Sequence, residues 1–145
     1  MPPKSLGGSL PTEVFISHSS HDTDFVVGLV NVLRSHGIPC WYSATNILGA
    51  QQWHDEIGKA LNRCDWFILV LSPNSVDSIW VKRELFYALQ QNRFENRILP
   101  IVFQDCDQSR LSWVLPSLQS IDFEADLALG FKDLLRTWGL GYQPG

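Results

Sequence analysis

Six apolar residues follow one another near the middle of the chain, Trp66-Phe67-Ile68-Leu69-Val70-Leu71, and Ser72-Pro73-Asn74 ends the run. A strand with one wet face would alternate apolar and polar residues, whereas an uninterrupted run predicts a strand buried on both faces. Sheets built from such strands are parallel and carry helices on both sides. The run therefore indicates an α/β domain.

Segments on either side of this strand alternate between strand-like and helix-like patterns. Further strands are predicted for Glu13 to Ser17, Ile38 to Tyr42, Ile98 to Phe103 and Leu118 to Asp122. A first helix is predicted from Asp22 or Thr23 to Gly37, and apolar residues recur at helical spacing in Trp53 to Cys64, Ser78 to Leu89 and Leu127 to Trp138. Ser43 to Gln52 has no periodicity and predicts a loop. This alternation predicts a flavodoxin-like three-layer sandwich, with a five-stranded parallel sheet in the order 2-1-3-4-5.

Length and composition narrow the class of protein. A chain of 145 residues predicts one domain, over 13–139, with a disordered lead-in at 1–12 and a short tail at 140–145. The net charge of −4 argues against nucleic acid as a direct partner, and no apolar run reaches the roughly 20 residues that span a membrane. Three scattered cysteines without metal-ligand spacing predict buried free thiols, no metal site and a cytoplasmic location.

The segment from Ser78 to Leu85 contains the strongest functional candidates. Trp80 and Glu84 are four residues apart, one turn from each other on the same side of the predicted helix. The core-facing residues of this helix should be Val81, Leu85, Ala88 and Leu89. We therefore expect Glu84 at the margin of the core and partly exposed. A carboxylate beside an indole could hold a positively charged ring or a sugar; a solvated glutamate beside a rim tryptophan is the alternative.

The predicted topology places a binding site near this pair. Ligands of such sheets bind at the carboxyl ends of the strands where the strand order reverses, here beyond Ser17-His18-Ser19 and Ser72-Pro73-Asn74. The acidic residues of a phosphoacceptor receiver domain are missing there, and no glycine-rich phosphate loop follows the first strand. His18 and His21 lack a third metal ligand, and no G-x-S-x-G elbow supports a serine nucleophile.

Five motifs in order resemble a Toll/interleukin-1 receptor (TIR) domain of the bacterial type. They are Val14-Phe15-Ile16-Ser17-His18-Ser19-Ser20-His21-Asp22, Cys40-Trp41-Tyr42, the loop ending at Gly49, Leu71-Ser72-Pro73-Asn74-Ser75 and Trp80-Val81-Lys82-Arg83-Glu84-Leu85. The resemblance covers about residues 13 to 138. The family divides into NAD-cleaving enzymes and adaptors that only self-associate. The Trp-x-x-x-Glu pair matches the enzymatic members, so the resemblance implies that Glu84 is catalytic.

The resemblance also implies a substrate and partners. NAD⁺ would be the substrate, and no cofactor would be needed. The products would be nicotinamide and either ADP-ribose or a cyclic ADP-ribose. The activity would serve immune, anti-phage signalling and would depend on TIR–TIR assembly, including assembly into filaments. The substrate-binding candidates are Trp80, Phe15, Ser17, His18, Trp41, Tyr42 and Asn46; core packing is the alternative for Phe15 and Trp41. Apolar Ile47 and Leu48, with Gly49, make the loop after the second strand the candidate interface.

One departure and two alternatives accompany this interpretation. Bacterial members often have Arg-Asp where this chain has Thr45-Asn46, which changes how the loop can meet substrate or a neighbouring subunit. A pure interaction module would have the same fold with Glu84 as a bystander. A nucleoside deoxyribosyltransferase-like enzyme would share the layout and a catalytic glutamate but act on deoxynucleosides.

Overall fold

The computed structural model describes residues 10–42 and 50–144, with the side chains of the first helical residues after this gap described from Asp55 onward. Its sheet has five parallel strands in the order β2-β1-β3-β4-β5, which confirms the predicted flavodoxin-like fold. The strands are β1 (Val14–Ser17), β2 (Cys40–Tyr42), β3 (Trp66–Leu71), β4 (Ile98–Val102) and β5 (Ile121–Asp122). β3, the apolar run, lies at the centre of the sheet.

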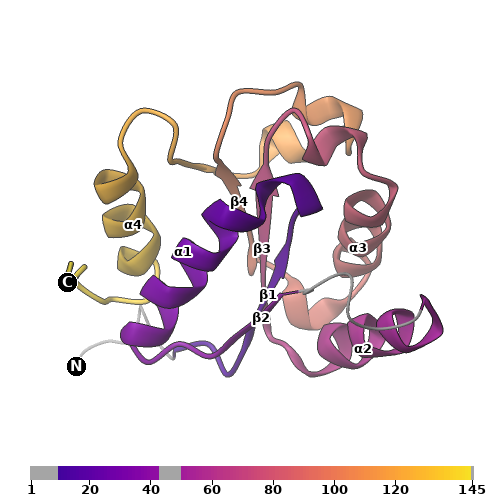
Figure 1. Cartoon of the computed structure of the whole chain (residues 1–145), viewed down its shortest axis with the longest axis horizontal. Helices are drawn as coiled ribbons and strands as arrows, with labels where there is room; N and C mark the ends of the chain where they lie inside the picture. Colours follow the sequence, from indigo (N-terminus) through magenta and orange to yellow (C-terminus); the bar gives the residue numbers. More distant parts are fainter. Residues whose placement is uncertain (1–9, 43–49, 145) are drawn as a thin grey trace.

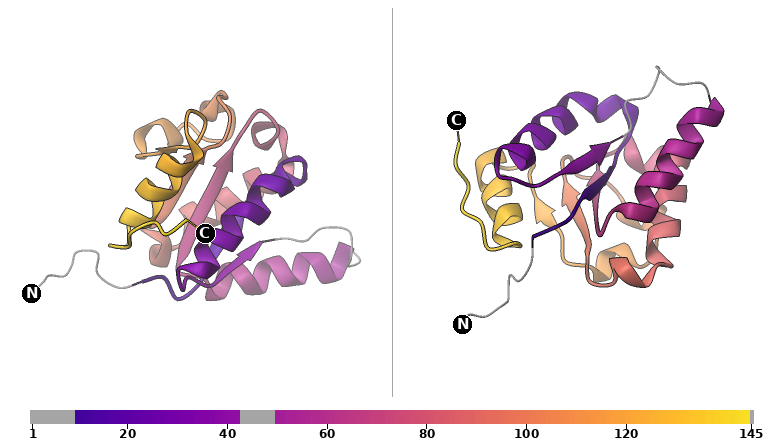
Figure 2. Two further views of the ribbon diagram at one scale, coloured as in Figure 1. Left: turned by 60° about the vertical axis from the view of Figure 1, so that its left-hand side comes forward. Right: turned by 90° about the horizontal axis from the view of Figure 1, so that it is seen from below.

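Two helices cover each face of the sheet (Figure 1; Figure 2). Helices α1 (Thr23–Ser35) and α4 (Leu127–Arg136) lie on one face, and α2 (Ala50–Arg63) and α3 (Ile79–Leu89) lie on the other. Short 3₁₀ turns complete the described elements: η1 (Ser20–Asp22), η2 (Ser75–Asp77), η3 (Asn92–Phe94), η4 (Gln108–Arg110) and η5 (Leu115–Ser117). None of the helices in the described ranges is long and apolar enough to cross a membrane.

The alternation of side chains along β1 assigns its residues to the two faces. Val14 and Ile16 pack with α1 and α4, whereas Phe15 packs with α2 and α3. Ser17 follows Phe15 by two residues and therefore points to the same face as Phe15, where α3 lies. Because Ser17 is also the last residue of β1, a hydroxyl stands at the carboxyl end of the sheet, directed at α3.

Several helix and strand boundaries differ from those predicted by the sequence. Helix α2 begins at Ala50, inside the stretch predicted as a loop, because Ala and Gln are good helix formers even without an apolar period. The fifth strand is shortened to Ile121–Asp122, since Leu115–Ser117 forms a 3₁₀ turn that Leu118 closes through its N–H to the Leu115 carbonyl.

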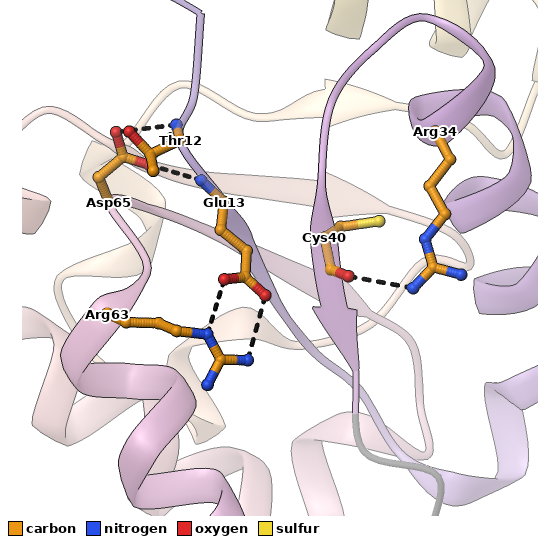
Figure 3. Close-up of polar contacts among 6 residues, drawn as sticks. All are labelled: Thr12, Glu13, Arg34, Cys40, Arg63 and Asp65. Atoms are coloured by element: carbon orange, nitrogen blue, oxygen red, sulfur yellow. Dashed lines mark hydrogen bonds and ion pairs between the residues drawn. The ribbon is translucent and has the colours of Figure 1, made fainter.

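Polar contacts hold β1 at its amino-terminal end (Figure 3). The Asp65 carboxylate accepts hydrogen bonds from the backbone N–H groups of Thr12 and Glu13, at 3.0 and 3.2 Å. Arg63 donates twice to the Glu13 carboxylate, from Nε at 2.7 Å and from Nη2 at 3.1 Å. On β2, the Cys40 carbonyl accepts from Arg34 at 3.2 Å. These contacts leave the opposite, carboxyl end of the sheet free to form a site.

Candidate active site

Glu84 lies inside the apolar side of α3 instead of at its margin. The helix begins after Ser78, whose Oγ accepts a hydrogen bond from the Val81 N–H at 3.2 Å. Glu84 is 7% exposed, so the expectation of a partly exposed residue was wrong. The physical reason is angular: with about 100° per residue, position 84 lies only about 40° around the helix from Ala88. Glu84 therefore occupies a core position that an apolar residue would normally fill.

Ser17 is the hydrogen-bond partner of this buried carboxyl group. Its Oγ donates to Glu84 Oε1 at 2.7 Å, from the end of β1. Burial raises the pKa of Glu84 from its ordinary 4.5 to about 7, and the hydrogen bond from Ser17 lowers it. Burial prevails because one neutral hydroxyl replaces only part of the lost hydration. The group is thus poised to be ionised or neutral near physiological pH.

A cavity of about 490 Å³ opens above Glu84 at the carboxyl end of the sheet. This volume is within the range of small-molecule sites. Trp80 stands at its edge, 36% exposed, and the Arg83 guanidinium lies 5.3 Å from the centroid of the Trp80 ring. The lining residues come from the end of β1 and its loop, from the loop after β3 and from α3: Ile16, His18, Ser19, Ser20, His21, Asn74, Asp77, Ser78, Ile79, Trp80 and Glu84.

A second, smaller cavity of about 270 Å³ lies between α2 and α3. Trp80 and Glu84 line it as well, so these two residues form the wall that the cavities share. Apolar Ile57 and Leu61 of α2 face it, and Tyr87 donates to Asn62 Oδ1 at 2.7 Å beside it. The carboxyl group therefore lies between a polar cavity and an apolar one.

His18 contributes a half-buried imidazole to the larger cavity. Burial lowers the pKa of His18, while the backbone contact with Ile16 and the negative charge of Asp22 raise it. Its ring centroid is 6.1 Å from that of Tyr42. A neutral imidazole can both donate and accept a hydrogen bond at this position.

The structure brings some of the predicted site residues together and separates others. Trp80, His18 and Glu84 line the larger cavity, and Ser17 is joined to it through its hydrogen bond to Glu84. Phe15 is 1% exposed and stacks between Trp41 and Phe67, so it belongs to the core below the cavity. Trp41 packs in the same cluster, and Tyr42 packs on the other face of the sheet. The predictions for Asn46, Ile47, Leu48 and Gly49, and the Thr45-Asn46 departure, lie outside the described residues.

Two residues that line the cavity, Asp77 and Ile79, were not named as site candidates from the sequence, whereas the strand order had placed Asn74 at the predicted site. Both lie at or just before the start of α3, and their closeness in sequence to Trp80 was the signal that could have identified them. Among the residues that the structure describes, no group of three or more His, Cys, Asp or Glu side chains is placed to hold a metal ion.

Comparison with known proteins assigns the family. The family model of the TIR domain matches residues 14–135. The chain belongs to the TIR-domain family. This TIR domain superposes on the TIR domain of the Toll-related receptor TRR-2 from Hydra magnipapillata with a TM-score of 0.69 and 21% identity, covering 85% of this chain and 94% of that one. That likeness shows the shared fold.

Two similar relatives are named as a 2' cyclic ADP-D-ribose synthase and a probable one. The TIR domain is 31% identical over 107 residues to the 2' cyclic ADP-D-ribose synthase BtTIR of Bacteroides thetaiotaomicron, over 73% of this chain and 37% of that protein. It is 28% identical over 91 residues to the probable 2' cyclic ADP-D-ribose synthase TcpO of Methanobrevibacter olleyae, over 62% of this chain and 27% of that protein. The chain thus spans about a third of the length of these relatives.

Proposed function

We propose that this TIR domain cleaves NAD⁺ at the bond between nicotinamide and ribose. The observation that carries the proposal is the buried carboxyl group of Glu84, which faces a cavity of about 490 Å³ with Trp80 at its edge. The names of the two relatives support this substrate, because both are described as cyclic ADP-ribose synthases. The products proposed here are nicotinamide and either ADP-ribose or a cyclic ADP-ribose.

The chemistry needs few groups from the protein. When the C1′–N bond breaks, its electron pair stays with the nicotinamide nitrogen, which was cationic and leaves as a neutral ring. No general acid is required, in contrast to ordinary glycoside hydrolysis with its two carboxyl groups. The positive charge moves to the ribosyl group, and an ionised Glu84 stabilises that charge electrostatically. Water then bonds to C1′ and releases a proton to give ADP-ribose, or a hydroxyl group of the same molecule does so to give a cyclic product. Burial strengthens this interaction because little water competes for the carboxylate.

Trp80 is proposed to bind an aromatic ring of the substrate. Its exposed face stands one turn before Glu84 on α3, so a ring stacked on the indole lies near the carboxylate. Ser17 holds Glu84 in place, and His18 with the hydroxyl groups of Ser19 and Ser20 offers donors and acceptors for the rest of the ligand.

Assembly and biological role form a further part of the proposal. We propose that TIR–TIR contacts through the loop after β2 are needed for turnover, and that the activity serves immune, anti-phage signalling in the cytoplasm. Support for assembly comes from the family resemblance and from the apolar pair Ile47 and Leu48 in the sequence. The buried free thiols of Cys40 and Cys64 agree with a reducing compartment.

Incubation of the protein with NAD⁺ tests the central proposal. Nicotinamide release, followed by chromatography, should occur with the native protein and fall by orders of magnitude in Glu84→Gln, which keeps the shape but removes the charge. Glu95→Gln, an exposed glutamate elsewhere, is the matched control and should retain full turnover. Parallel incubation with deoxynucleosides tests the deoxyribosyltransferase alternative. Absence of nicotinamide at every protein concentration, or full turnover in Glu84→Gln, would contradict the proposal.

A further inference from the structure

A second buried carboxylate, Asp22, lies behind the wall of the larger cavity. It is 4% exposed and ends the loop that follows β1. Two donors from the loop after β3 face it: Ser72 Oγ donates to one oxygen at 2.5 Å, and Asn74 Nδ2 donates to the other at 3.1 Å. Each carboxylate oxygen of Asp22 thus holds a different residue of the neighbouring loop.

The local role expected of an aspartate at this position is absent. Asp22 is the N-cap residue of α1, and aspartate side chains there commonly accept a hydrogen bond from the first helical turn. The Asp22 side chain makes no such bond. Its hydrogen bonds go instead across the sheet edge to the loop after β3, which indicates a function in joining the two loops.

The contacts of Ser72 continue from Asp22 towards α3. Ser72 Oγ also accepts from the Ser75 N–H at 3.1 Å, and Ser75 Oγ accepts from the Ser72 N–H at 2.9 Å. The Ser78 N–H then donates to the Ser75 carbonyl at 3.0 Å, and Ser78 caps α3. A continuous set of hydrogen bonds therefore links Asp22 to the beginning of the helix that contains Trp80 and Glu84.

Both of the joined loops line the cavity. His18 to His21 belong to the first loop, and Asn74, Asp77 and Ser78 belong to the second. On the side of the first loop, the Asp22 N–H donates to the Ser19 carbonyl at 2.9 Å and the His21 N–H donates to Ser19 Oγ at 3.2 Å. Each loop is thus braced internally, and Asp22 is the side chain that connects them.

We propose that Asp22 is a positioning residue. It sets the distance between the loops after β1 and β3, which line the cavity, and thereby aligns His18 and the start of α3 with Glu84. The proposal rests on NAD⁺ cleavage as the function of the cavity. A loop displacement of about 1 Å can lower the rate at an active site by as much as 100-fold. Loss of the Asp22 hydrogen bonds to Ser72 and Asn74 should therefore change the kinetics measurably.

Exchanging the donor and the acceptor of the hydrogen bond between residues 22 and 74 tests the proposal. In Asp22→Asn the side chain has one acceptor oxygen instead of two, so either Ser72 or Asn74 loses its acceptor. The reciprocal variant, Asp22→Asn combined with Asn74→Asp, restores the pair, because the amide introduced at position 22 can donate to the carboxylate introduced at position 74 and still accept from Ser72. Asp24→Asn, an exposed aspartate in the first turn of α1, is the matched control.

Kinetics measured at a temperature where every variant is folded give the first readout. We expect kcat/KM for NAD⁺ to fall about tenfold in Asp22→Asn, to recover to within about threefold of the native value in the reciprocal variant, and to stay unchanged in Asp24→Asn. A lowered melting temperature with native kcat/KM in Asp22→Asn would overturn the proposal. The proposal would also be overturned if the loss in kcat/KM of the reciprocal variant equalled the combined losses of Asp22→Asn and Asn74→Asp measured separately.

Two readouts do not depend on NAD⁺ cleavage. The negative charge of Asp22 raises the pKa of His18, so the NMR titration of His18 should shift to lower pH in Asp22→Asn and return towards the native value in the reciprocal variant. Amide hydrogen exchange at residues 72–78 should rise in Asp22→Asn and recover in the same way. If the native protein releases no nicotinamide, the proposed function fails. Unchanged amide hydrogen exchange at residues 72–78 in Asp22→Asn would then also overturn the proposal that Asp22 holds the two loops together.

Discussion

Ser17 Oγ and Glu84 Oε1 meet at 2.7 Å, although the two residues are 67 positions apart in the sequence. The parallel pairing of β1 with β3 places the end of β1 beside α3, and the alternation along β1 directs Ser17 at the carboxyl group. The hydrogen bond favours the ionised form of Glu84 and burial opposes it. The outcome of this competition determines when the site is charged.

Nicotinamide release should depend on pH in the direction set by Glu84. Because burial raises the pKa of Glu84 to about 7, kcat/KM should increase as pH rises through 7 and reach a plateau above it. Ser17→Ala removes the hydrogen bond that lowers this pKa, so the midpoint should move to higher pH. Rates measured from about pH 5.5 to 9 check this, with the exposed Ser35→Ala as control. An unmoved or more acidic midpoint in Ser17→Ala would contradict it.

Glu84→Gln should stabilise the protein at alkaline pH. The folded state retains the proton to about pH 7 and the unfolded chain only to about 4.5, so the unfolded state binds fewer protons between these values and stability falls as pH rises. At about 1.4 kcal/mol per pKa unit, the ionised group costs roughly 3 kcal/mol above pH 7. Urea unfolding should show the native protein to be less stable than Glu84→Gln at pH 8 and similar to it at pH 5.

The exposed Glu95→Gln variant should show no such pH-dependent difference in urea unfolding. Equal stability of Glu84→Gln and the native protein at both pH values would mean that Glu84 is not held in the apolar surroundings described here.

Trp80 should matter more for substrate binding than for stability. A Trp80→Ala variant should weaken NAD⁺ binding by about 1–3 kcal/mol, by analogy with base–aromatic stacking, and Trp80→Phe should recover part of the loss. The unfolding free energy should drop by less than the roughly 3–5 kcal/mol typical of a fully buried tryptophan, because Trp80 is 36% exposed. Measurements of KM and of the melting temperature on both variants distinguish a role of Trp80 in substrate binding from a role in packing. Phe86→Ala, a more exposed aromatic on the same helix, is the control.

Turnover per subunit should rise with protein concentration if assembly is required. Leu48→Asp places a charge in the proposed contact and should abolish that rise. The native protein and this variant can be compared by sedimentation and by nicotinamide release over the same concentrations. A native monomer whose specific activity does not change with concentration would count against assembly.

The sequence was sufficient for the fold and for the position of the cavity that Trp80 and Glu84 line. The two-sided apolar run at Trp66–Leu71 predicted a buried parallel strand, and the alternation around it predicted the sheet order. The four-residue spacing of Trp80 and Glu84 predicted that they share one side of a helix. The reversal of strand order predicted that this helix begins at the carboxyl end of the sheet. These features depend on local periodicity and topology, which a sequence displays directly.

The environment of the carboxyl groups could not be predicted in the same way. Helical spacing places Glu84 only about 40° from Ala88 and so favours its burial, but it does not specify that the end of β1 brings Ser17 to the carboxyl group. Asp22 looked like an ordinary helix start, and its partners Ser72 and Asn74 become neighbours only when β1 pairs with β3. Long-range polar contacts of this kind have no period in the sequence, so the structure was needed to find them.

The buried position of Glu84 also links ligand binding to proton release. At about pH 6 the free protein holds a proton on this carboxyl group, since its pKa is about 7. A cationic ring bound against the group favours the carboxylate, so that proton must pass to the solvent as the ligand enters. The heat of binding at pH 6 should then vary with the ionisation enthalpy of the buffer, and at pH 9 it should not. In acidic solution, the proposed binding of NAD⁺ would therefore exchange one positive charge, the proton on Glu84, for another, the nicotinamide ring.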